Sequence, residues 1–453
     1  MSFNVPQGSI LVSMPGERGT TTFDSKNITS ITATSTPTGW KVNDIDMYKG
    51  TITVTAPSTF ENGEVYNGDI TLKGYSPIGS TATLTIYVAI LPNADIDFST
   101  TPANCFVATQ PATRYHINPY IGGTATPLAT ADVKLLWQSR KGLIKFLDMR
   151  NDDVTFYLAK AENDEGEEID EVYEGNALIG AYDASGKLIW SWHVWVTNNK
   201  PESSTVNING RTMMNVNLGA SCNSEGSTDH DKILGSYGLF YQWGRKAPIV
   251  GPYSWNFNGN EDGRIYDVDG TMLYYQYATS TAEHGTTTWS NENPISIILG
   301  NPENSYNWLF TGNDDTLWSD TSKTEQDPCP YGWRVADSET FATLTIATAE
   351  DDLPWEEAQP MCGWRLTDAQ TSQSYFFSAA GRRNYIDGRL DIVNDDEIYP
   401  IPWSGYYWSS TTDGAMAKAL YFDLNTATRA WNAIEVARPM QRANAMPVRC
   451  IRE

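Results

Sequence analysis

Short segments in which apolar and polar side chains alternate dominate the first half of the chain. In residues 84–90 the apolar side chains occupy every second position, and residues 51–56 alternate threonine with Ile, Val and Ala. A period of two is typical of a β-strand with one buried face. We therefore expect residues 1–94 to form an antiparallel β-sandwich.

A second β-sandwich is predicted over residues 95–199. Its last segment places Trp190, Trp192 and Val194 on one face of a strand. Each Trp can bury about 150–250 Å², so this face is expected in a core. His193 lies on the other face and is interpreted as a structural histidine. The polar, proline-containing segment 198–204 then reads as a linker.

Residues 205–453 differ from both β-rich regions. They are rich in Trp, Tyr, Gly and Asn and contain few helical patterns. One helix start is predicted at Asp337, which can cap the first turn, while Phe341 and Leu344 share one helix face. The chain is thus expected to be mainly β and multidomain, with two antiparallel β-sandwiches followed by an α+β domain.

Charge and composition exclude several classes of protein. The 453 residues include 31 Lys+Arg and 55 Asp+Glu, which gives a net charge of -24. This balance opposes non-specific binding to nucleic acid or to anionic membranes. An aromatic content of 12% excludes a disordered chain. No apolar stretch approaches the roughly 18 residues of a membrane-spanning helix, so no direct membrane span is expected.

The cellular location is left open by the N-terminal residues and by the cysteines. Residues 1–6 show no basic start followed by an apolar core, as a signal peptide would. The protein is therefore either cytoplasmic or begins after a removed signal. The odd number of cysteines leaves at least one free thiol or one intermolecular bridge. The five are Cys105, Cys222, Cys329, Cys362 and Cys450.

The chain lacks the common sequence motifs for catalysis. The chain has no G-x-S-x-G, G-x-x-x-x-G-K-[ST], G-x-G-x-x-G, H-E-x-x-H or C-x-x-C motif, and its four histidines lack metal-ligand spacing. Acidic residues at 356–357 and 395–397 could supply paired carboxylates, but nothing fixes the separation that glycoside hydrolysis needs. We expect a non-enzymatic protein with no cofactor and no metal.

Four segments of the last region carry a resemblance to a known family. They are 238–246 (GLFYQWGRK), 327–335 (DPCPYGWRV), 405–410 (GYYWSS) and 447–452 (PVRCIR). In this order they resemble the Fibrobacter/Bacteroidetes major paralogous domain, a surface-protein module with a C-type-lectin-like fold. The resemblance covers residues 205–453. The chain departs from the family at Asn215-Val216, where an Asp-Arg pair is usual.

The earlier regions resemble modules that accompany this domain in Bacteroidetes surface proteins. The matching segments are 103–107, 175–179 and the strand at 190–197. Three-part chains of this kind resemble fimbrial (type V pilus) tip adhesins, some of which are diversified by a retroelement. The resemblance implies a cell-surface or extracellular protein and favours a removed signal. It also implies a stalk or pilus-docking role for residues 1–94, with pilin subunits and a glycan or protein receptor as partners.

The same resemblance bears on the cysteines and on calcium. Cys329 and Cys450 lie in the paired motifs of the family, which implies a disulfide; the alternative is two reduced, buried thiols. Sugar-binding C-type lectins use a Trp-Asn-Asp segment beside calcium. The corresponding segment here, 431–433, reads Trp-Asn-Ala and lacks the carboxylate. Calcium-dependent sugar binding is therefore not supported.

The ligand-binding side chains are predicted between residues 381 and 445. Tyr and Trp give rigid contact area, and Arg and Asn add directional hydrogen bonds. If Leu420 and Phe422 face the core, Tyr421 and Asp423 point outward. Tyr407 is assigned to the core with Trp408. The predicted contact residues are Arg382, Arg383, Asn384, Tyr385, Trp403, Tyr406, Tyr421, Asp423, Arg429, Trp431 and Asn432.

These features predict a surface-displayed adhesin, a fimbrial tip protein, that binds a glycan or protein ligand through residues 205–453. The main alternative is a carbohydrate-binding surface lipoprotein of a glycan-uptake system. An enzyme built on the lectin-like fold is a more remote alternative.

Overall fold

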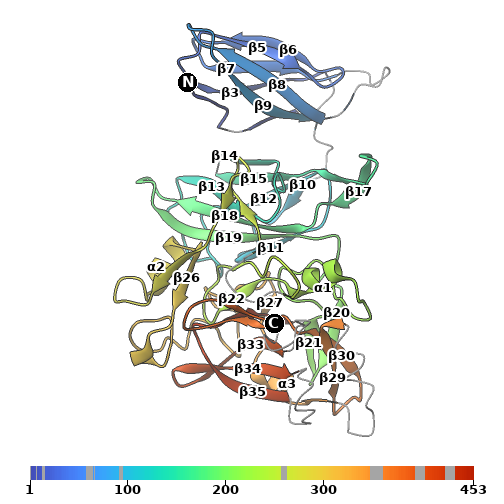
Figure 1. Ribbon diagram of the computed structural model, residues 1–453, viewed down its shortest axis with the longest axis vertical. Coiled ribbons are helices and arrows are strands. Elements are labelled where there is room, and N and C mark those ends of the chain that lie inside the picture. Colours follow the sequence, from blue (N-terminus) through green and yellow to red (C-terminus); the bar gives the residue numbers. More distant parts are fainter. Residues whose placement is uncertain are drawn as a thin grey trace. The chain divides into compact units, whose positions relative to one another are not determined.

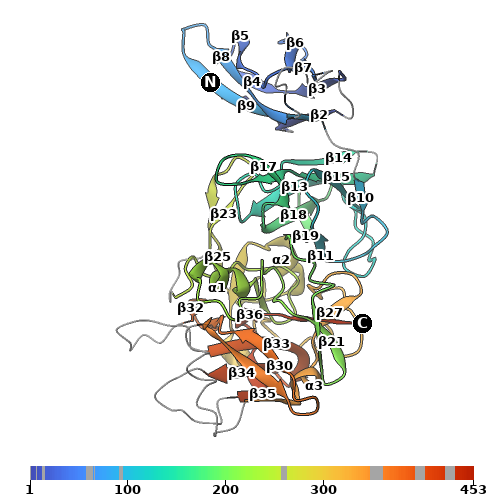
Figure 2. The same cartoon turned by 90° about the vertical axis from the view of Figure 1, so that its right-hand side faces the viewer.

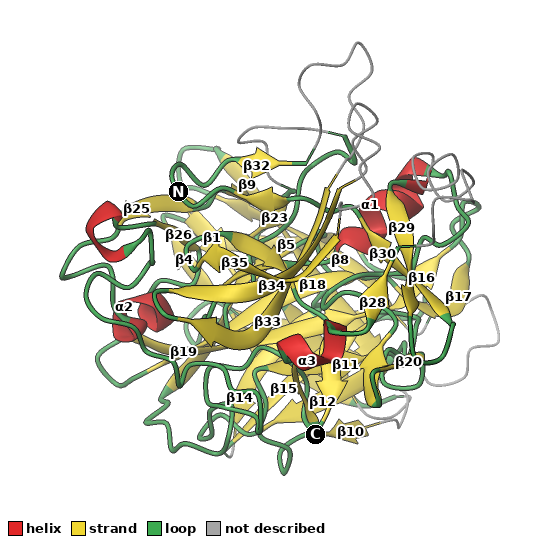
Figure 3. Cartoon of the chain, turned by 90° about the horizontal axis from the view of Figure 1, so that it is seen from below, coloured by secondary structure: helices red, strands yellow, loops and turns green. Residues whose placement is uncertain are grey.

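The computed structural model describes residues 2–6, 8–12, 16–57, 65, 67–90, 95–150, 152–256, 263–346, 361–392, 404–423 and 434–453. This part of the chain is mainly β, with strands far outnumbering the short helices (Figure 3). The chain divides into two compact units. Unit 1 comprises residues 1–100, 110–118 and 144–172, and unit 2 comprises residues 101–109, 119–143 and 173–453.

The first 90 residues of unit 1 form the predicted β-sandwich (Figure 1). Ile52, Val54, Ile86 and Val88 are fully buried in its core, so the alternating pattern is confirmed. One sheet has the order β2 (Ser9–Val12), β9 (Thr81–Ile90), β8 (Asn67–Tyr75) and β5 (Ser30–Ser35). The other has the order β3 (Arg18–Thr22), β7 (Thr51–Thr55) and β6 (Lys41–Asp46), and β1 (Ser2–Asn4) pairs with β4 (Asp24–Lys26).

A further four-stranded sheet and a hairpin complete unit 1. The sheet has the order β10 (Asp95–Asp97), β12 (Thr113–Ile117), β15 (Asp153–Leu158) and β14 (Phe146–Arg150). The hairpin joins β16 (Lys160–Glu162) to β17 (Glu168–Val172). Tyr115 of β12 stacks on Phe156 of β15 with 5.1 Å between ring centroids, which fixes the register of the two neighbouring strands.

Unit 2 is built on a six-stranded sheet that combines residues from both sides of the predicted linker. Its order is β11 (Cys105–Ala108), β19 (Leu188–Val196), β18 (Gly175–Tyr182), β13 (Asp132–Gln138), β23 (Ile265–Tyr266) and β24 (Met272–Leu273). Trp190 and Trp192 are buried, as the sequence predicts. Trp195, which points to the opposite face of β19, is buried as well.

Residues 205–453 bury this second face of β19. The Trp195 indole Nε1 donates to the carbonyl oxygen of Ala220 at 3.0 Å. The Lys246 ammonium donates to the backbone oxygen of Ser191 at 2.9 Å and to its Oγ at 2.8 Å. The sheet and residues 205–453 therefore share one core, although the sequence pattern indicated a separate sandwich followed by a linker.

His193 belongs to the same buried face of β19. Its Nε2 donates to Asn176 Oδ1 at 2.9 Å, and Asn176 Nδ2 in turn donates to the carbonyl oxygen of Gly219. Burial lowers the pKa of His193 to about 3, so the ring is neutral at neutral pH. This environment supports the interpretation of His193 as a structural residue.

The rest of unit 2 consists of small sheets and short helices. One four-stranded sheet has the order β20 (Thr205–Ile208), β21 (Arg211–Met214), β37 (Cys450–Arg452) and β27 (Trp333–Val335), and another has the order β22 (Phe240–Gln242), β36 (Ala445–Pro447), β31 (Arg382–Arg383) and β32 (Leu390–Asp391). Strands β25 (Gln276–Thr279) and β26 (Ser296–Leu299) form a two-stranded sheet. Two three-stranded sheets have the orders β28 (Leu344–Thr345), β29 (Gly363–Asp368), β30 (Ser374–Ser378) and β33 (Ser404–Asp413), β34 (Met416–Asp423), β35 (Ile434–Gln441). The helices are α1 (His230–Tyr237), α2 (Thr287–Glu292), α3 (Ser338–Phe341) and the 3₁₀ turn η1 (Pro302–Asn304). None of the helices in the described ranges is both long and apolar enough to cross a membrane.

Helix α3 begins where the sequence predicts. The Asp337 carboxylate accepts a hydrogen bond from the Thr340 amide at 3.0 Å, which caps the first turn. Phe341 and Leu344 are buried in one cluster with Tyr407 and Leu420. The expectation that they share one helix face is wrong, because α3 ends at Phe341 and Leu344 lies on β28. Helix α3 contacts β33, β34 and β35 and so supports one face of that sheet (Figure 2).

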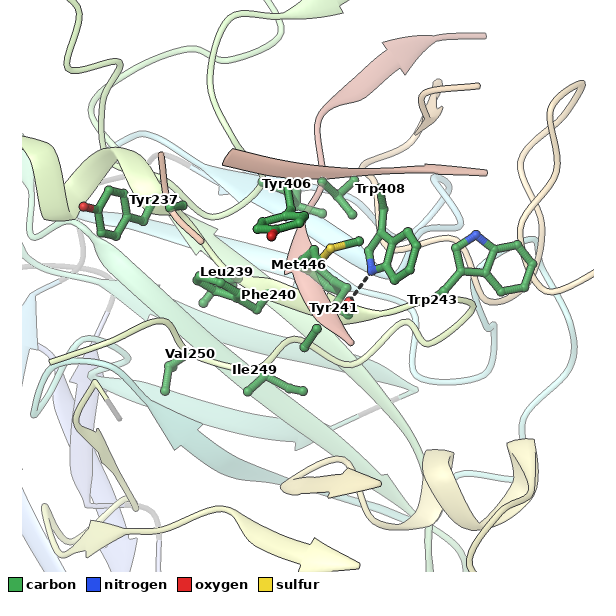
Figure 4. Close-up of a cluster of buried hydrophobic side chains, with 14 of the residues drawn as sticks. Tyr237, Leu239, Phe240, Tyr241, Trp243, Ile249, Val250, Tyr406, Trp408 and Met446 are labelled. Carbon is green, nitrogen blue, oxygen red and sulfur yellow. Dashed lines mark hydrogen bonds between the residues drawn. The ribbon is translucent and has the colours of Figure 1, made fainter. Parts of the chain in front are cut away.

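The segments that carry the family resemblance meet in the core of unit 2. Trp408 Nε1 donates to the carbonyl oxygen of Tyr241 at 2.8 Å, and Trp243 lies beside this pair (Figure 4). Strand β27 pairs with β37, and a disulfide joins Cys329 to Cys450 across 121 residues of sequence. The structure therefore contains the cysteine pairing that the resemblance implies.

Removing this disulfide should lower the stability of the protein substantially. In the chain-entropy model, opening a loop of this length costs about 5 kcal/mol. We expect the Cys329→Ala/Cys450→Ala variant to unfold at a much lower urea concentration than the parent protein. Cys222→Ala, which removes a thiol outside the bridge, should leave the midpoint nearly unchanged. Equal midpoints for the double variant and the parent would contradict the expectation.

The buried amine of Lys246 should make stability depend on pH. Burial lowers its pKa from 10.5 to about 7. Between pH 7 and pH 10.5 the unfolded chain carries a proton on this amine that the folded chain lacks. The free energy of unfolding therefore rises with pH, by up to about 1.4 kcal/mol per pH unit. We expect urea unfolding at pH 7, 8 and 9 to show this rise in the parent and a weaker one in Lys246→Met. The exposed control Lys232→Met should keep the parental slope, whereas an unchanged slope in Lys246→Met would contradict the prediction.

Candidate functional site

Four of the predicted contact residues lie outside the described residues. They are Trp403, Arg429, Trp431 and Asn432. The carboxylate clusters at 356–357 and 395–397 lie outside them too. The structure places the other seven predicted residues on strands β31, β33 and β34 and in the turn after β31.

Arg383 lies in the core of unit 2 and not on its surface. Its side chain is completely buried, and its guanidinium donates to the carbonyl oxygens of Gly388 at 3.2 Å and Val250 at 3.0 Å. These bonds brace the turn between β31 and β32 against the segment around residue 250. The prediction that Arg383 contacts a ligand is therefore corrected to a structural role, because no surface-bound ligand reaches a fully buried side chain.

Asn384 and Tyr385 shape the turn that follows β31. Asn384 Oδ1 accepts from the Ile386 amide at 2.8 Å, a local bond typical of turns. The Tyr385 ring lies edge-on to Tyr306 with 4.8 Å between centroids and is partly buried against the core. Both side chains contribute to the shape of the turn and leave only part of their surface for other contacts.

Arg382, Tyr406 and Tyr421 come together in one stack with a fourth residue, Arg438. Tyr406 and Tyr421 are directly opposite in the register of β33 and β34, with 4.9 Å between ring centroids. The Arg382 guanidinium lies 5.1 Å from the Tyr406 ring, and the Arg438 guanidinium lies 4.1 Å from the Tyr421 ring. We call these four residues the cation–tyrosine stack.

Carboxylates flank the stack and hold its members in place. Arg382 Nε donates to Asp391 Oδ2 at 3.3 Å, and the Tyr421 hydroxyl donates to Asp423 Oδ2 at 3.2 Å. Arg438 lies 3.7 Å from a Glu435 carboxylate oxygen. The two cations are thus matched by acidic partners, and the stack presents both charges together with ring surface.

Burial changes the acidity of the two tyrosines. It raises the pKa of Tyr406 and that of Tyr421, and desolvation is the largest cause in each case. Both hydroxyls therefore stay protonated at neutral pH and can donate hydrogen bonds. Tyr406 is 7% exposed and belongs to the core cluster of unit 2, so the prediction that it contacts a ligand is corrected to a supporting role under Tyr421. Tyr421 and Asp423 are half-buried. Leu420 and Phe422 are fully buried, so the predicted inward and outward alternation of β34 is confirmed.

The arrangement favours recognition over covalent chemistry. Aromatic faces pack against the apolar surface of a ligand, and guanidinium groups donate hydrogen bonds to carboxylate or carbonyl oxygens. In the described part of the chain, no group of three His, Cys, Asp or Glu side chains is arranged to hold a metal ion. The stack is thus equipped to bind a ligand by stacking and hydrogen bonding.

Arg438 and Asp391 were not among the predicted contact residues. Arg438 reaches the stack because β34 pairs with β35, where Ala419 is opposite Arg438 and Tyr421 is opposite Glu435. The sequence shows an alternating strand pattern for β34, but it does not show which strand pairs with β34. Pairing between strands that a long connection separates leaves no local signal in the sequence. The register of β34 with β35 would have identified Arg438, and that of β31 with β32, where Arg382 is opposite Asp391, would have identified Asp391.

The two adjacent arginines of β31 should respond differently to substitution. Arg383→Gln removes charged hydrogen bonds to two carbonyl groups in the core and should cost about 2–3 kcal/mol. Arg382→Gln removes a partly exposed ion pair and should cost less than about 1 kcal/mol. Urea unfolding of both variants measures the difference. Equal losses would contradict the structural role assigned to Arg383.

Comparison with known proteins gives no family assignment. No protein-family model matches the chain. No curated protein matches it either.

Several solved structures are similar to part of the chain, with low overall agreement. The D00-D0 domain of intimin shares 10% identity over 43% of this chain and 96% of its own, with a TM-score of 0.17. The SGBP-B protein of a Bacteroides ovatus mixed-linkage glucan utilization locus, solved with a mixed-linkage heptasaccharide, shares 15% identity over 41% of this chain, with a TM-score of 0.12. This chain spans 42% of that protein. An Ig1-2 module of the Drosophila receptor tyrosine phosphatase DLAR shares 10% identity over 43% of this chain and 97% of its own, with a TM-score of 0.16. Similarities this low assign neither a domain fold nor a function.

Proposed function

We propose that this protein is a surface-displayed adhesin that binds a glycan or protein receptor through residues 205–453, without catalysis. The observation that carries the proposal is the cation–tyrosine stack. Its four residues come from the four strands β31, β33, β34 and β35, and its rings and guanidinium groups are of the kinds that dominate recognition surfaces.

The support of the stack suits a binding role. The sheet of β33, β34 and β35 has buried side chains on both faces, with Tyr407 and Phe422 in one cluster and Trp408 and Ala419 in another. A sheet packed on both faces moves little. Tyr406 and Tyr421 are therefore already ordered in the folded protein, and a ligand does not need to order them on binding. A preorganised surface of this kind binds more tightly than a mobile one.

Sequence position links the stack to the contact residues that the structure leaves undescribed. Tyr421 and Asp423 end β34, and Glu435 and Arg438 lie on β35. Arg429, Trp431 and Asn432 fall in the connection between these two strands. We propose that these three residues contact the ligand together with the stack.

The finer parts of the proposal rest on the resemblance of the four sequence segments. They are display at a fimbrial tip, docking of residues 1–94 to pilin subunits, and diversification of the binding surface by a retroelement. A glycan-uptake lipoprotein remains the alternative, and the ligand separates it from an adhesin.

Binding of the full-length chain to arrayed glycans and to host and bacterial surface proteins tests the proposal. We expect saturable binding that falls at least tenfold in Tyr421→Ala and in Trp431→Ala, because each loses a ring that contacts the ligand. Tyr421→Phe should keep most of the binding. Tyr48→Ala, which removes a tyrosine that is 98% exposed in unit 1, should have no effect. Measurements with and without calcium decide its role.

Two results would contradict parts of the proposal. Binding that is unchanged in both Tyr421→Ala and Trp431→Ala would place the site elsewhere. Binding restricted to soluble nutrient polysaccharides would favour the glycan-uptake alternative.

A further inference from the structure

A cavity of about 440 Å³ opens within unit 2, and none of its lining residues belongs to the cation–tyrosine stack. It lies where β18 and β19 of the large sheet meet the segments at 219–221, 234–239, 250–253 and 263–266. Its volume falls within the range of about 300–1,000 Å³ that is usual for small-molecule sites. The cavity is therefore large enough for one or two sugar rings.

The walls of this cavity are largely bare backbone and apolar side chains. A Cβ on Gly175 would lie 2.6 Å from Ser139 Oγ, and one on Gly238 would lie 2.7 Å from the Leu218 carbonyl oxygen. Gly238 also has a positive φ of 69°, which side-chain-bearing residues rarely adopt. Close packing thus requires glycine at these positions.

The apolar floor is continuous with the core of unit 2. Tyr237, Leu239 and Val250 line the cavity and belong to the buried cluster around Tyr241 and Trp243 (Figure 4). The Tyr237 hydroxyl donates to the carbonyl oxygen of Trp255 at 2.8 Å, which fixes its ring. A ligand entering the cavity would therefore meet a rigid apolar surface.

Three cations packed on tyrosine rings lie on the lining residues of the cavity or next to them in sequence. The guanidinium of Arg264, which lines the cavity, lies 4.7 Å from the Tyr253 ring centroid and donates to the Tyr253 hydroxyl at 3.1 Å. Lys141 Nζ lies 5.1 Å from the centroid of Tyr266, another lining residue. The third pair is Arg140 on Tyr173, at 3.9 Å. Arg140 and Tyr173 adjoin the lining residues Ser139 and Glu174 in sequence.

One carboxylate, Glu174, lies among the lining residues. Its Oε1 accepts hydrogen bonds from Thr197 Oγ1 and from the Asn198 amide, both at 2.9 Å. These donors partly offset its charge. Among the lining residues, Glu174 is balanced by the guanidinium of Arg264, and Lys141 lies on the ring of the lining residue Tyr266. Arg264 and Lys141 are therefore the groups that would attract an anionic ligand.

We propose that this cavity binds a short saccharide that carries a carboxylate, such as a uronic or sialic acid. The apolar floor accommodates the faces of a sugar ring. Arg264, whose described contacts are with Tyr253, offers further N–H donors to the sugar carboxylate. The half-exposed Tyr253 and the exposed Arg140 and Lys141 add ring surface and attraction for the anion. This is a second ligand site, independent of the stack.

Titration of the full-length chain with N-acetylneuraminic acid, glucuronic acid and glucose, followed by saturation-transfer NMR and calorimetry, tests the proposal. We expect at least one acidic sugar to bind at least tenfold more tightly than glucose. Arg264→Gln should weaken that binding at least tenfold, and Arg264→Lys should restore part of it. Ser221→Trp, which fills the cavity, should abolish it.

Arg382→Gln serves as the matched control, because it removes a cation from the stack and leaves the cavity intact. Retained acidic-sugar binding in Arg382→Gln supports the cavity as the site. Binding lost in Arg382→Gln but retained in Arg264→Gln would overturn the proposal and assign the ligand to the stack. The proposal would also be overturned if neither acidic sugar bound, or if glucose bound as tightly as the acidic sugars. Thermal melting of each variant establishes that a loss of binding does not reflect unfolding.

Discussion

Burial of the second face of strand β19 is the constraint on which unit 2 depends. Trp195 and His193 point to this face, and a sheet cannot leave an indole of that size in water without a large loss of free energy. Residues 205–453 cover the face and supply the hydrogen-bond partner of the Trp195 indole. The amine of Lys246 then reaches Ser191 across the same contact. When residues 205–453 cover this apolar face, they also bury polar groups, and each buried polar group needs a hydrogen-bond partner.

This contact also explains how the binding surfaces are held. The cluster that begins at Trp195 continues through Trp243 and Trp408 to the sheet of β33, β34 and β35. Tyr406 projects from the same face of β33 as Trp408, so one end of the cation–tyrosine stack is fixed to the core (Figure 4). The glycine-walled cavity lies along the same contact, where β18 approaches the segment around Gly238. Both candidate sites therefore use the rigidity of one core.

Local features of the structure were predictable from sequence, whereas long-range contacts were not. Alternation located the cores around Ile52 and Ile86, and a capping aspartate located α3, because both signals lie within a few residues. Alternation also implies that Arg382 and Arg383 point to opposite faces of β31, but it does not tell which one points inward. That depends on the carbonyl groups of Gly388 and Val250, the second of which is far away in sequence. The cavity and Arg438 were missed for the same reason, since both arise from segments that only the fold brings together.

The position of β37 has a consequence for the order in which the chain acquires its structure. Strand β37 lies between β21 and β27, so residues 450–452 occupy the interior of a sheet whose other strands are made much earlier. This sheet cannot close while the ribosome is still adding those residues, and contacts between such distant segments form slowly. Until then, β21 and β27 have no strand between them. The disulfide between Cys329 and Cys450 can form only once the last residues are made, and it then ties the late strand to the segment before β27.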